Sequence, residues 1–79
     1  MGAADELLER ARNRPGGLSF RDFERLLGDS GWQMVRQRAS HRVWRSPKGS
    51  MLPIQPRGKD AKQYQVRQFL KLYEQEQRS

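Results

Sequence analysis

Apolar residues recur at helical spacing in the first half of the chain. Four of them would share one face of a helix: Phe20, Phe23, Leu26 and Leu27. Their spacing predicts a helix over about residues 19–29, because these side chains would form one buried face. The hydroxyl of Ser19 can cap its first turn, and Gly28 or Gly31 can end it.

The same pattern is clearest near the end of the chain. The apolar stripe there consists of Val66, Phe69, Leu70 and Tyr73. It predicts a helix from Ala61 to about Gln75. Asp60 stands directly before this segment, and its carboxylate can cap the free amides of a first turn.

A narrower apolar stripe over residues 3–14 predicts a third helix, formed by Leu7, Leu8 and Ala11. Residues 15–17, Pro-Gly-Gly, then break the chain. A helix this short is not stable alone, so we expect it to dock on the domain or on a partner; a partly ordered arm is the alternative. We therefore divide the chain into an N-terminal helical extension and linker, residues 1–17, and a main domain, residues 18–79.

Three short stretches between the predicted helices have the character of strands: residues 32–38, 40–46 and 50–54. Pro47 and Gly49 suit a turn between the last two, and Pro53 predicts that the third strand lies at an edge or ends there. Residues 55–59 are expected to form a basic loop. The order helix, helix, three strands, helix predicts an α+β fold, a three-stranded antiparallel sheet with helices packed on one face.

The second predicted strand has two candidate buried faces. Alternation along a strand puts every second side chain on the same side of the sheet. The two sets are His41, Val43 and Arg45 on one side, and Arg42 and Trp44 on the other. Val43 and Trp44 are both suited to burial, so the pattern does not decide which face is covered.

Composition limits the class of protein. The chain has 79 residues, one small domain, and no cysteine, which excludes disulfides and thiolate metal sites. It has no apolar run of the ~20 residues that span a bilayer and no signal-peptide pattern. One histidine and scattered carboxylates predict no metal site and no cofactor. We expect a soluble protein of the cytoplasm that does not bind a membrane.

Basic charge is concentrated in the second part of the chain. Residues 1–31 carry five basic and six acidic side chains, whereas residues 32–79 carry eleven basic and three acidic ones. Residues 36–59 contain no acidic residue and these basic ones: Arg36, Arg38, Arg42, Arg45, Lys48, Arg57 and Lys59. Segregated positive charge attracts polyanions, and nucleic acid is the commonest such partner. A membrane surface or an acidic protein is the weaker alternative, and a basic surface that serves only solubility is weaker too.

The only histidine, His41, lies inside this basic segment, next to Ser40. Cleavage of RNA without a metal requires a group that takes the proton of the ribose 2′-hydroxyl, and imidazole titrates closest to neutral pH. Nearby arginines can stabilise charge on the phosphate, and Ser40 can orient the substrate or the imidazole. A lone histidine is ordinarily a surface or packing residue, so its place in this segment is what favours catalysis.

Several short motifs follow one another in a fixed order. A Leu-Leu-x-x-x-Gly-aromatic step at residues 26–32 precedes Val-Arg-Gln-x-x-Ser-His at residues 35–41 and aromatic-Arg-x-Pro-x-Gly at residues 44–49. Gly-Lys-Asp-x-Lys at residues 58–62 then precedes Val-Arg-x-Phe-Leu-Lys at residues 66–71. No single motif is specific, but together, over about residues 20–73, they resemble the HicA family of bacterial messenger-RNA interferase toxins.

The resemblance implies a fold similar to that of double-stranded-RNA-binding domains. It also implies cleavage of RNA without a metal by the histidine of a Gly-Ser-His motif, here His41, and a HicB-type antitoxin as the partner that silences the toxin. Two positions depart from the family pattern. Ala39 stands where the family usually has glycine, so a positive φ there would carry strain, and Gln55 stands where many members have a second histidine.

Three hypotheses follow from these observations. The first is an endoribonuclease toxin in which His41 acts as general acid and base, while Ser40 and the basic residues of segment 36–59 bind messenger RNA. The alternative is a non-catalytic double-stranded-RNA-binding module on the same fold, which would bind duplex RNA whatever residue occupies position 41. Ala39 and Gln55 are the features that favour this alternative. The weakest hypothesis is a protein-interaction adaptor whose first helix docks on an acidic partner.

Overall fold

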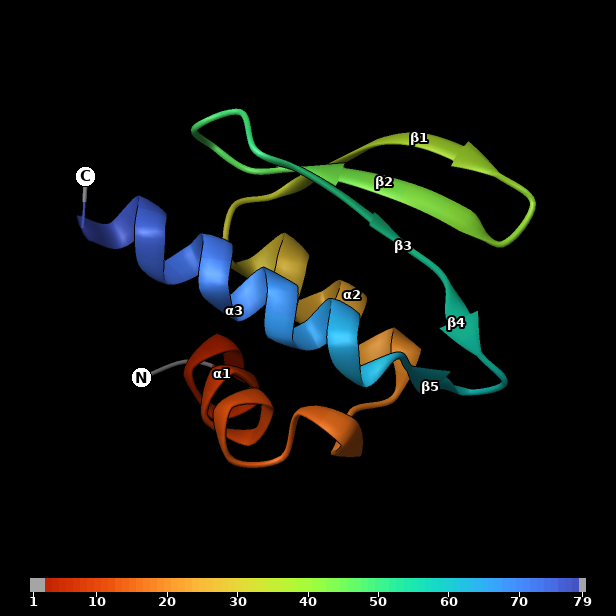
Figure 1. Cartoon of the computed structure of the whole chain (residues 1–79), viewed down its shortest axis with the longest axis horizontal. Helices are drawn as coiled ribbons and strands as arrows, with labels where there is room; N and C mark the ends of the chain where they lie inside the picture. Colours follow the sequence, from red (N-terminus) through yellow and green to blue (C-terminus); the bar gives the residue numbers. More distant parts are fainter. Residues whose placement is uncertain (1–2, 79) are drawn as a thin grey trace.

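In the computed structural model, which describes residues 3–78, a three-stranded sheet covers two helices and a third helix lies beneath them (Figure 1). The helices are α1 (Ala3–Asn13), α2 (Phe20–Asp29) and α3 (Gln63–Arg78), with a 3-10 turn, η1 (Pro15–Gly17), after the first. The strands of the sheet are β1 (Gln33–Arg38), β2 (His41–Arg45) and β3 (Met51–Ile54). A separate two-stranded ribbon consists of β4 (Pro56–Arg57) and β5 (Asp60–Ala61). The predicted α+β fold, with helices on one face of an antiparallel sheet, is confirmed.

The sheet has the strand order β1-β2-β3, so β1 and β3 are its edges. Pro53 lies in β3, and proline, which cannot donate a ladder hydrogen bond, is tolerated at such an edge. The edge position predicted from Pro53 is therefore confirmed. β2, which carries His41, is the central strand and is held on both sides.

The register of the sheet decides which face of β2 is covered. Leu52 and Ile54 of β3 are buried, and their partners across the ladder are Trp44 and Arg42. Directly paired residues lie on the same face of a sheet, so Trp44 and Arg42 face the helices. The other side of the sheet, which we call the open face, carries His41, Val43 and Arg45 of β2.

The centre of the core is the ring of Phe69 in α3. It lies edge-on to the ring of Phe23 in α2, with 6.0 Å between centroids, and to the ring of Trp32, with 5.5 Å. Each such pair contributes about 0.5–1.5 kcal/mol beyond the area that it buries. The apolar stripes of α2 and α3 thus meet each other beneath the sheet, as their spacing predicts.

Helix α1 belongs to the same core. The side chains of Leu7 and Ala11 are buried in it, 6% and 0% exposed, and the Arg10 guanidinium lies 3.6 Å from the Asp22 carboxylate of α2. The helix packs on α2 and α3, on the side away from the sheet (Figure 1). The structure therefore shows α1 docked on the domain, as expected, and not as a partly ordered arm.

One helix cap is confirmed and another is wrong. The Asp22 amide donates a hydrogen bond to the Ser19 hydroxyl at 3.0 Å, which caps α2 as expected. Asp60, in contrast, lies in β5, and α3 begins only at residue 63. The predicted loop forms a ribbon that pairs with the chain around the start of α2: the Phe20 amide donates to the carbonyl oxygen of Lys59 at 2.8 Å, and the Ala61 amide donates to that of Leu18 at 3.0 Å.

No helix among residues 3–78 has the length and hydropathy needed to cross a membrane. In the same part of the chain, no group of histidine, cysteine, aspartate and glutamate side chains is arranged to hold a metal ion.

Candidate functional site

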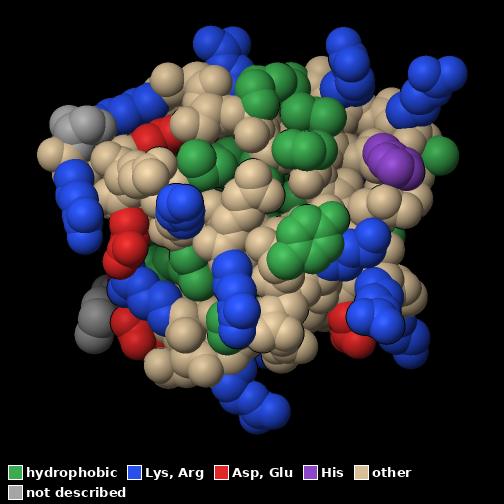
Figure 2. Space-filling view, viewed as in Figure 1, with side chains coloured by type: hydrophobic (Ala, Val, Ile, Leu, Met, Phe, Trp, Pro, Cys, Tyr) green, Lys and Arg blue, Asp and Glu red, His purple; other side chains and the backbone are tan. Residues whose placement is uncertain are grey.

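His41 is the first residue of β2, directly after the connection formed by Ala39 and Ser40. Its side chain is exposed, and its partner across the ladder is Arg38. Figure 2 shows the imidazole at the surface, at the end of the molecule where β1 and β2 connect, with basic side chains around it. The imidazole is therefore accessible to a large ligand.

Arg36 and Arg38 lie on the same open face as His41 because β1 contains a bulge. The register shifts between Met34 and Arg36, which leaves Val35 as the extra residue. Met34 lies opposite a residue of β2 that faces the helices. Strict alternation from Met34 would therefore have turned both arginines inward, whereas the bulge turns both of them outward.

An open hollow of about 430 Å³ brings these groups together on the open face. It is lined by Arg36, Arg38, Ala39, His41 and Val43. Neither of the two guanidinium groups forms an ion pair with a described carboxylate. Guanidinium groups in this state are suited to bind phosphate, to which arginine forms paired hydrogen bonds.

Ala39 bends the chain into β2 with a φ of 55°, the only positive φ among the described residues other than glycine. In a two-residue hairpin loop, a positive φ at the first position alone is the pattern of a type II′ turn, which favours glycine there. This conformation costs an alanine roughly 1–2 kcal/mol. The strain expected at Ala39 is thus present, directly beside Ser40 and His41.

Arg42 follows His41 in sequence but lies on the opposite face of the sheet. Its guanidinium forms an ion pair with the carboxylate of Glu24 in α2, and it lies over the ring of Phe20 at 5.4 Å from the centroid. The side chains of Arg42 and Glu24 are only 30% and 18% exposed. Arg42 thus joins β2 to α2, and it is not part of the hollow.

Ser40 and Arg45 lie on either side of the site. Ser40 is exposed in the connection before His41. Arg45 is on the open face at the other end of β2, four residues along the strand and so roughly 13 Å from His41. The structure therefore places Ser40 directly before His41 in the chain, outside the lining of the hollow, and Arg45 on the same face as His41 but further along β2.

The remaining basic candidates lie away from the hollow. Lys48 is in the turn between β2 and β3, where its Nζ donates a hydrogen bond to the backbone oxygen of Glu76 at 2.7 Å. Arg57 and Lys59 belong to the β4–β5 ribbon and are both exposed. The basic residues of segment 36–59 are therefore close in sequence but do not form a single cluster in the structure.

The end of α3 is bound to the same β2–β3 turn through Glu76. The Ser46 hydroxyl donates a hydrogen bond to Glu76 Oε2 at 2.6 Å. Burial raises the pKa of the Glu76 carboxyl, but hydrogen bonds from Ser46 and Ser50 and the charge of Lys48 outweigh this, so that the pKa lies below its ordinary value. This contact stabilises the fold and is remote from His41.

Gln55 lies next to the site on the β3 side. The ladder between β2 and β3 ends with the pair of Arg42 and Ile54, so Gln55 is the first residue beyond it. The backbone amide of Gln55 donates a hydrogen bond to Gln65 Oε1 of α3 at 3.0 Å. The backbone of Gln55 is therefore joined to α3.

The sequence pattern does not single out a second basic surface, at the start of α3, to which Lys62, Tyr64 and Arg67 contribute. Their position off the apolar stripe of the helix indicates only that they are exposed. Nothing in the local spacing shows that the β4–β5 ribbon and η1 come to lie beside them.

Comparison with known proteins identifies a family. A family model for the HicA toxin of bacterial toxin-antitoxin systems matches residues 20–74. The match covers α2, the strands and most of α3, and it leaves α1 and η1 outside. A search of curated proteins and a search of solved structures each found no significant match.

Proposed function

Because the chain belongs to the HicA toxin family of bacterial toxin-antitoxin systems, we propose that it is an endoribonuclease that cleaves messenger RNA without a metal. His41 is its general acid-base residue. The observation that supports this most directly is the exposed imidazole in one hollow with two guanidinium groups. Cleavage of messenger RNA in the cytoplasm would block translation, which accounts for toxicity.

The proposed reaction is an attack by the ribose 2′-oxygen on the neighbouring phosphorus. His41 takes the proton of the 2′-hydroxyl, the P–O5′ bond breaks, and the products are a 2′,3′-cyclic phosphate and a 5′-hydroxyl. The chain has one histidine, so the proton for the 5′-oxygen comes from the imidazolium formed in the first step or from water. Proton transfer by a positioned side chain contributes roughly 10²–10⁴-fold to the rate.

Arg36 and Arg38 stabilise the negative charge of the pentavalent phosphorane. Arg38 is directly opposite His41, and Arg36 is one diagonal step away, so their Cβ atoms lie roughly 5 Å and 7–8 Å from that of His41. Paired hydrogen bonds from a guanidinium to phosphate oxygens are charge-assisted and strong. Arg45 holds a phosphate further along the strand, whereas Arg42 acts indirectly, by fixing β2 on α2.

We also propose that the open face is where a HicB-type antitoxin binds. The face combines the cations of Arg36 and Arg38 with Met51, which is 52% exposed. An acidic surface with apolar side chains at its centre would complement this combination. An antitoxin seated there would cover His41 and exclude RNA.

The products of the reaction test the proposed function. The purified protein with EDTA should cut RNA and leave 2′,3′-cyclic phosphate ends, because the nucleophile is the 2′-oxygen. An RNA with a 2′-deoxynucleotide at the cleaved position should bind equally well and remain intact. In cells, induced synthesis should arrest growth and His41→Ala should relieve the arrest. Cleavage of the deoxy substrate, or dependence on added metal, would refute the proposal.

A non-catalytic double-stranded-RNA-binding module on the same fold is the second candidate. The observation in its favour is that the chain has a single histidine, with an amide, Gln55, directly after β3, and so has no second imidazole to carry a proton. Such a module would bind duplex RNA tightly, with steep salt dependence, and would leave it intact over hours. Its affinity would also be the same in wild type and His41→Ala.

A further inference from the structure

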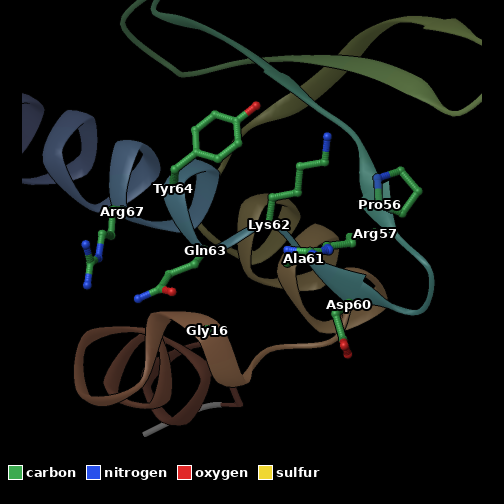
Figure 3. A pocket seen from close by; sticks show the side chains of 9 residues that line it. All are labelled: Gly16, Pro56, Arg57, Asp60, Ala61, Lys62, Gln63, Tyr64 and Arg67. Carbon is green, nitrogen blue, oxygen red and sulfur yellow. The ribbon is translucent and has the colours of Figure 1, made fainter.

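A groove of about 880 Å³ opens at the start of α3, outside the hollow that holds His41. Its walls are the β4–β5 ribbon, the first turns of α3 and Gly16 of η1 (Figure 3). A Cβ added at Gly16 would lie 3.3 Å from Gln63 Oε1, which shows how closely η1 approaches the helix. One wall of the groove therefore comes from outside the segment that matches the family.

The groove is basic. Arg57, Lys62 and Arg67 line it, and none of them forms an ion pair with a described carboxylate. Asp60 is the single acidic residue in the lining, and Figure 3 shows its side chain directed away from those of Lys62 and Tyr64. The N-terminus of α3, which begins at residue 63, adds partial positive charge to the groove.

Tyr64 contributes an aromatic ring to the same lining, on the side of Lys62 and opposite to that of Arg67 (Figure 3). It is 62% exposed, the most exposed of the large apolar side chains in the described residues. Its hydroxyl accepts a hydrogen bond from Gln65 Nε2 at 3.1 Å, which helps to orient the ring. Figure 3 shows Tyr64 and Lys62 extending to the same side of the groove. An aromatic face next to basic side chains is how proteins bind unpaired bases and their phosphates together.

One wall of the groove lies at the same end of the molecule as His41. The ribbon that forms its wall starts at residue 56, two residues after Ile54, whose partner across the sheet, Arg42, directly follows His41 in the chain. The β1–β2 connection and the β4–β5 ribbon lie at the same end of the molecule (Figure 1). A strand of RNA whose phosphate lies at His41 can therefore extend around the edge of the sheet into the groove.

We propose that this groove binds single-stranded RNA to one side of the cleaved phosphate. A base stacks on Tyr64, while Arg57, Lys62 and Arg67 hold the phosphates next to it. The proposal rests on the proposed function, since it takes RNA as the ligand, and it adds a second contact that requires no catalysis. It also gives η1, outside the family match, a role in substrate binding.

Stacking is tested by the affinity for a fluorescently labelled, short single-stranded RNA, measured by anisotropy in the His41→Ala background to prevent cleavage. Tyr64→Ala should weaken binding about tenfold, because stacking on an aromatic side chain is lost. Tyr64→Phe is the matched control, since it keeps the ring and removes only the hydroxyl. Its affinity should stay within about twofold of the parent.

The phosphate contacts are tested by salt dependence. Each phosphate neutralised on a single strand contributes about 0.7 to the slope of log affinity against log salt. Lys62→Gln combined with Arg67→Gln should therefore lower that slope by about 1.4. Arg78→Gln removes a charge from the far end of the same helix, outside the groove, and should leave the slope nearly unchanged.

The outcomes separate this proposal from the proposed function. Loss of affinity in the groove variants but not in the controls supports the groove. The groove proposal would be overturned if the groove variants lost no more affinity than the controls while Arg36→Gln still weakened binding. That result would leave the nuclease proposal intact. Wild type that binds no single-stranded RNA would overturn both. Amide shifts of residues 62–67 in the His41→Ala protein during an RNA titration give the same answer without any substitution in the groove, and unmoved signals there would also overturn the groove proposal.

Discussion

Among the described residues, Ala39 is the one with a side chain and a positive φ, 55°, a conformation that a side chain makes unfavourable. Ala39→Gly should raise the free energy of unfolding by about 1 kcal/mol, because glycine adopts a positive φ without a clash. Urea denaturation measures the change. Ala39→Val, which adds a branched side chain at the same φ, should lower the stability instead. A glycine variant less stable than wild type would show that the strain is absent.

Substitutions of Arg42 and Arg36 should separate an effect on stability from an effect on RNA binding. Arg42→Ala should lower the free energy of unfolding by roughly 1–2 kcal/mol, between the values for exposed and buried ion pairs, because the largely buried Glu24 loses its partner. Arg36→Ala, on the open face, should change stability by less than about 0.5 kcal/mol and should weaken RNA binding. Denaturation and anisotropy on both variants check this. The reverse pattern would contradict the assignment of faces.

The faces of β2 show what sequence can and cannot predict for single residues. Alternation alone separates His41 from Arg42, since neighbours in a strand point to opposite sides. Which side is covered depends on the partners of β3, Leu52 and Ile54, and their burial is a property of the packed sheet. The exposed position of His41 therefore follows from tertiary register and not from the local pattern.

At the scale of elements, the bulge in β1 is the feature that no local pattern predicts. The segment has no clear alternation, and all its residues are exposed. Only pairing with β2 shows that Val35 is extra and that Arg36 and Arg38 both face outward. The β4–β5 ribbon is a similar case, because its pairing partners include residue 19, far away in sequence. Helix α2, whose stripe and cap are both local, could be predicted fully.

Helix α1 should contribute to stability as an integral part of the domain. Leu7→Ala should lower the free energy of unfolding by about 2–4 kcal/mol, because the side chain is buried in the core and its removal leaves a cavity. Thermal or urea denaturation measures this. Glu6→Ala, at an exposed neighbouring position, is the matched control and should be nearly neutral. If both variants were as stable as wild type, α1 would not be docked.

The contact between α3 and the β2–β3 turn should depend on pH. The pKa of Glu76 is lower in the folded protein, so the unfolded state binds the proton more readily and stability rises with pH in this range. The contribution of Glu76 should be complete above about pH 4.3, the ordinary value for glutamate, and should be lost as the pH falls below it. Unfolding of wild type and Glu76→Gln at a series of pH values measures it. A stability difference between the two proteins that does not shrink on acidification would contradict this.

At the scale of the whole molecule, the fold separates the surfaces that hold the domain together from those that we propose bind RNA. The helices and the covered face of the sheet contain the core, whereas the open face and the groove at α3 carry cations that form no ion pair with a carboxylate of residues 3–78. The order of elements could be predicted from hydrophobic spacing, because each helix is amphipathic over its own length. The groove could not, because its walls come from η1, the ribbon and α3.

The measurement that tests the central claim most directly compares binding and cleavage of one RNA by wild type and His41→Ala. With protein in excess, a single-turnover time course gives the rate of bond cleavage, anisotropy gives the affinity, and circular dichroism confirms the fold. The account predicts a rate that falls by roughly 10²–10⁴-fold, with affinity changed by no more than about twofold, because the arginines that bind phosphate remain in place. Equal cleavage rates in the two proteins would contradict it.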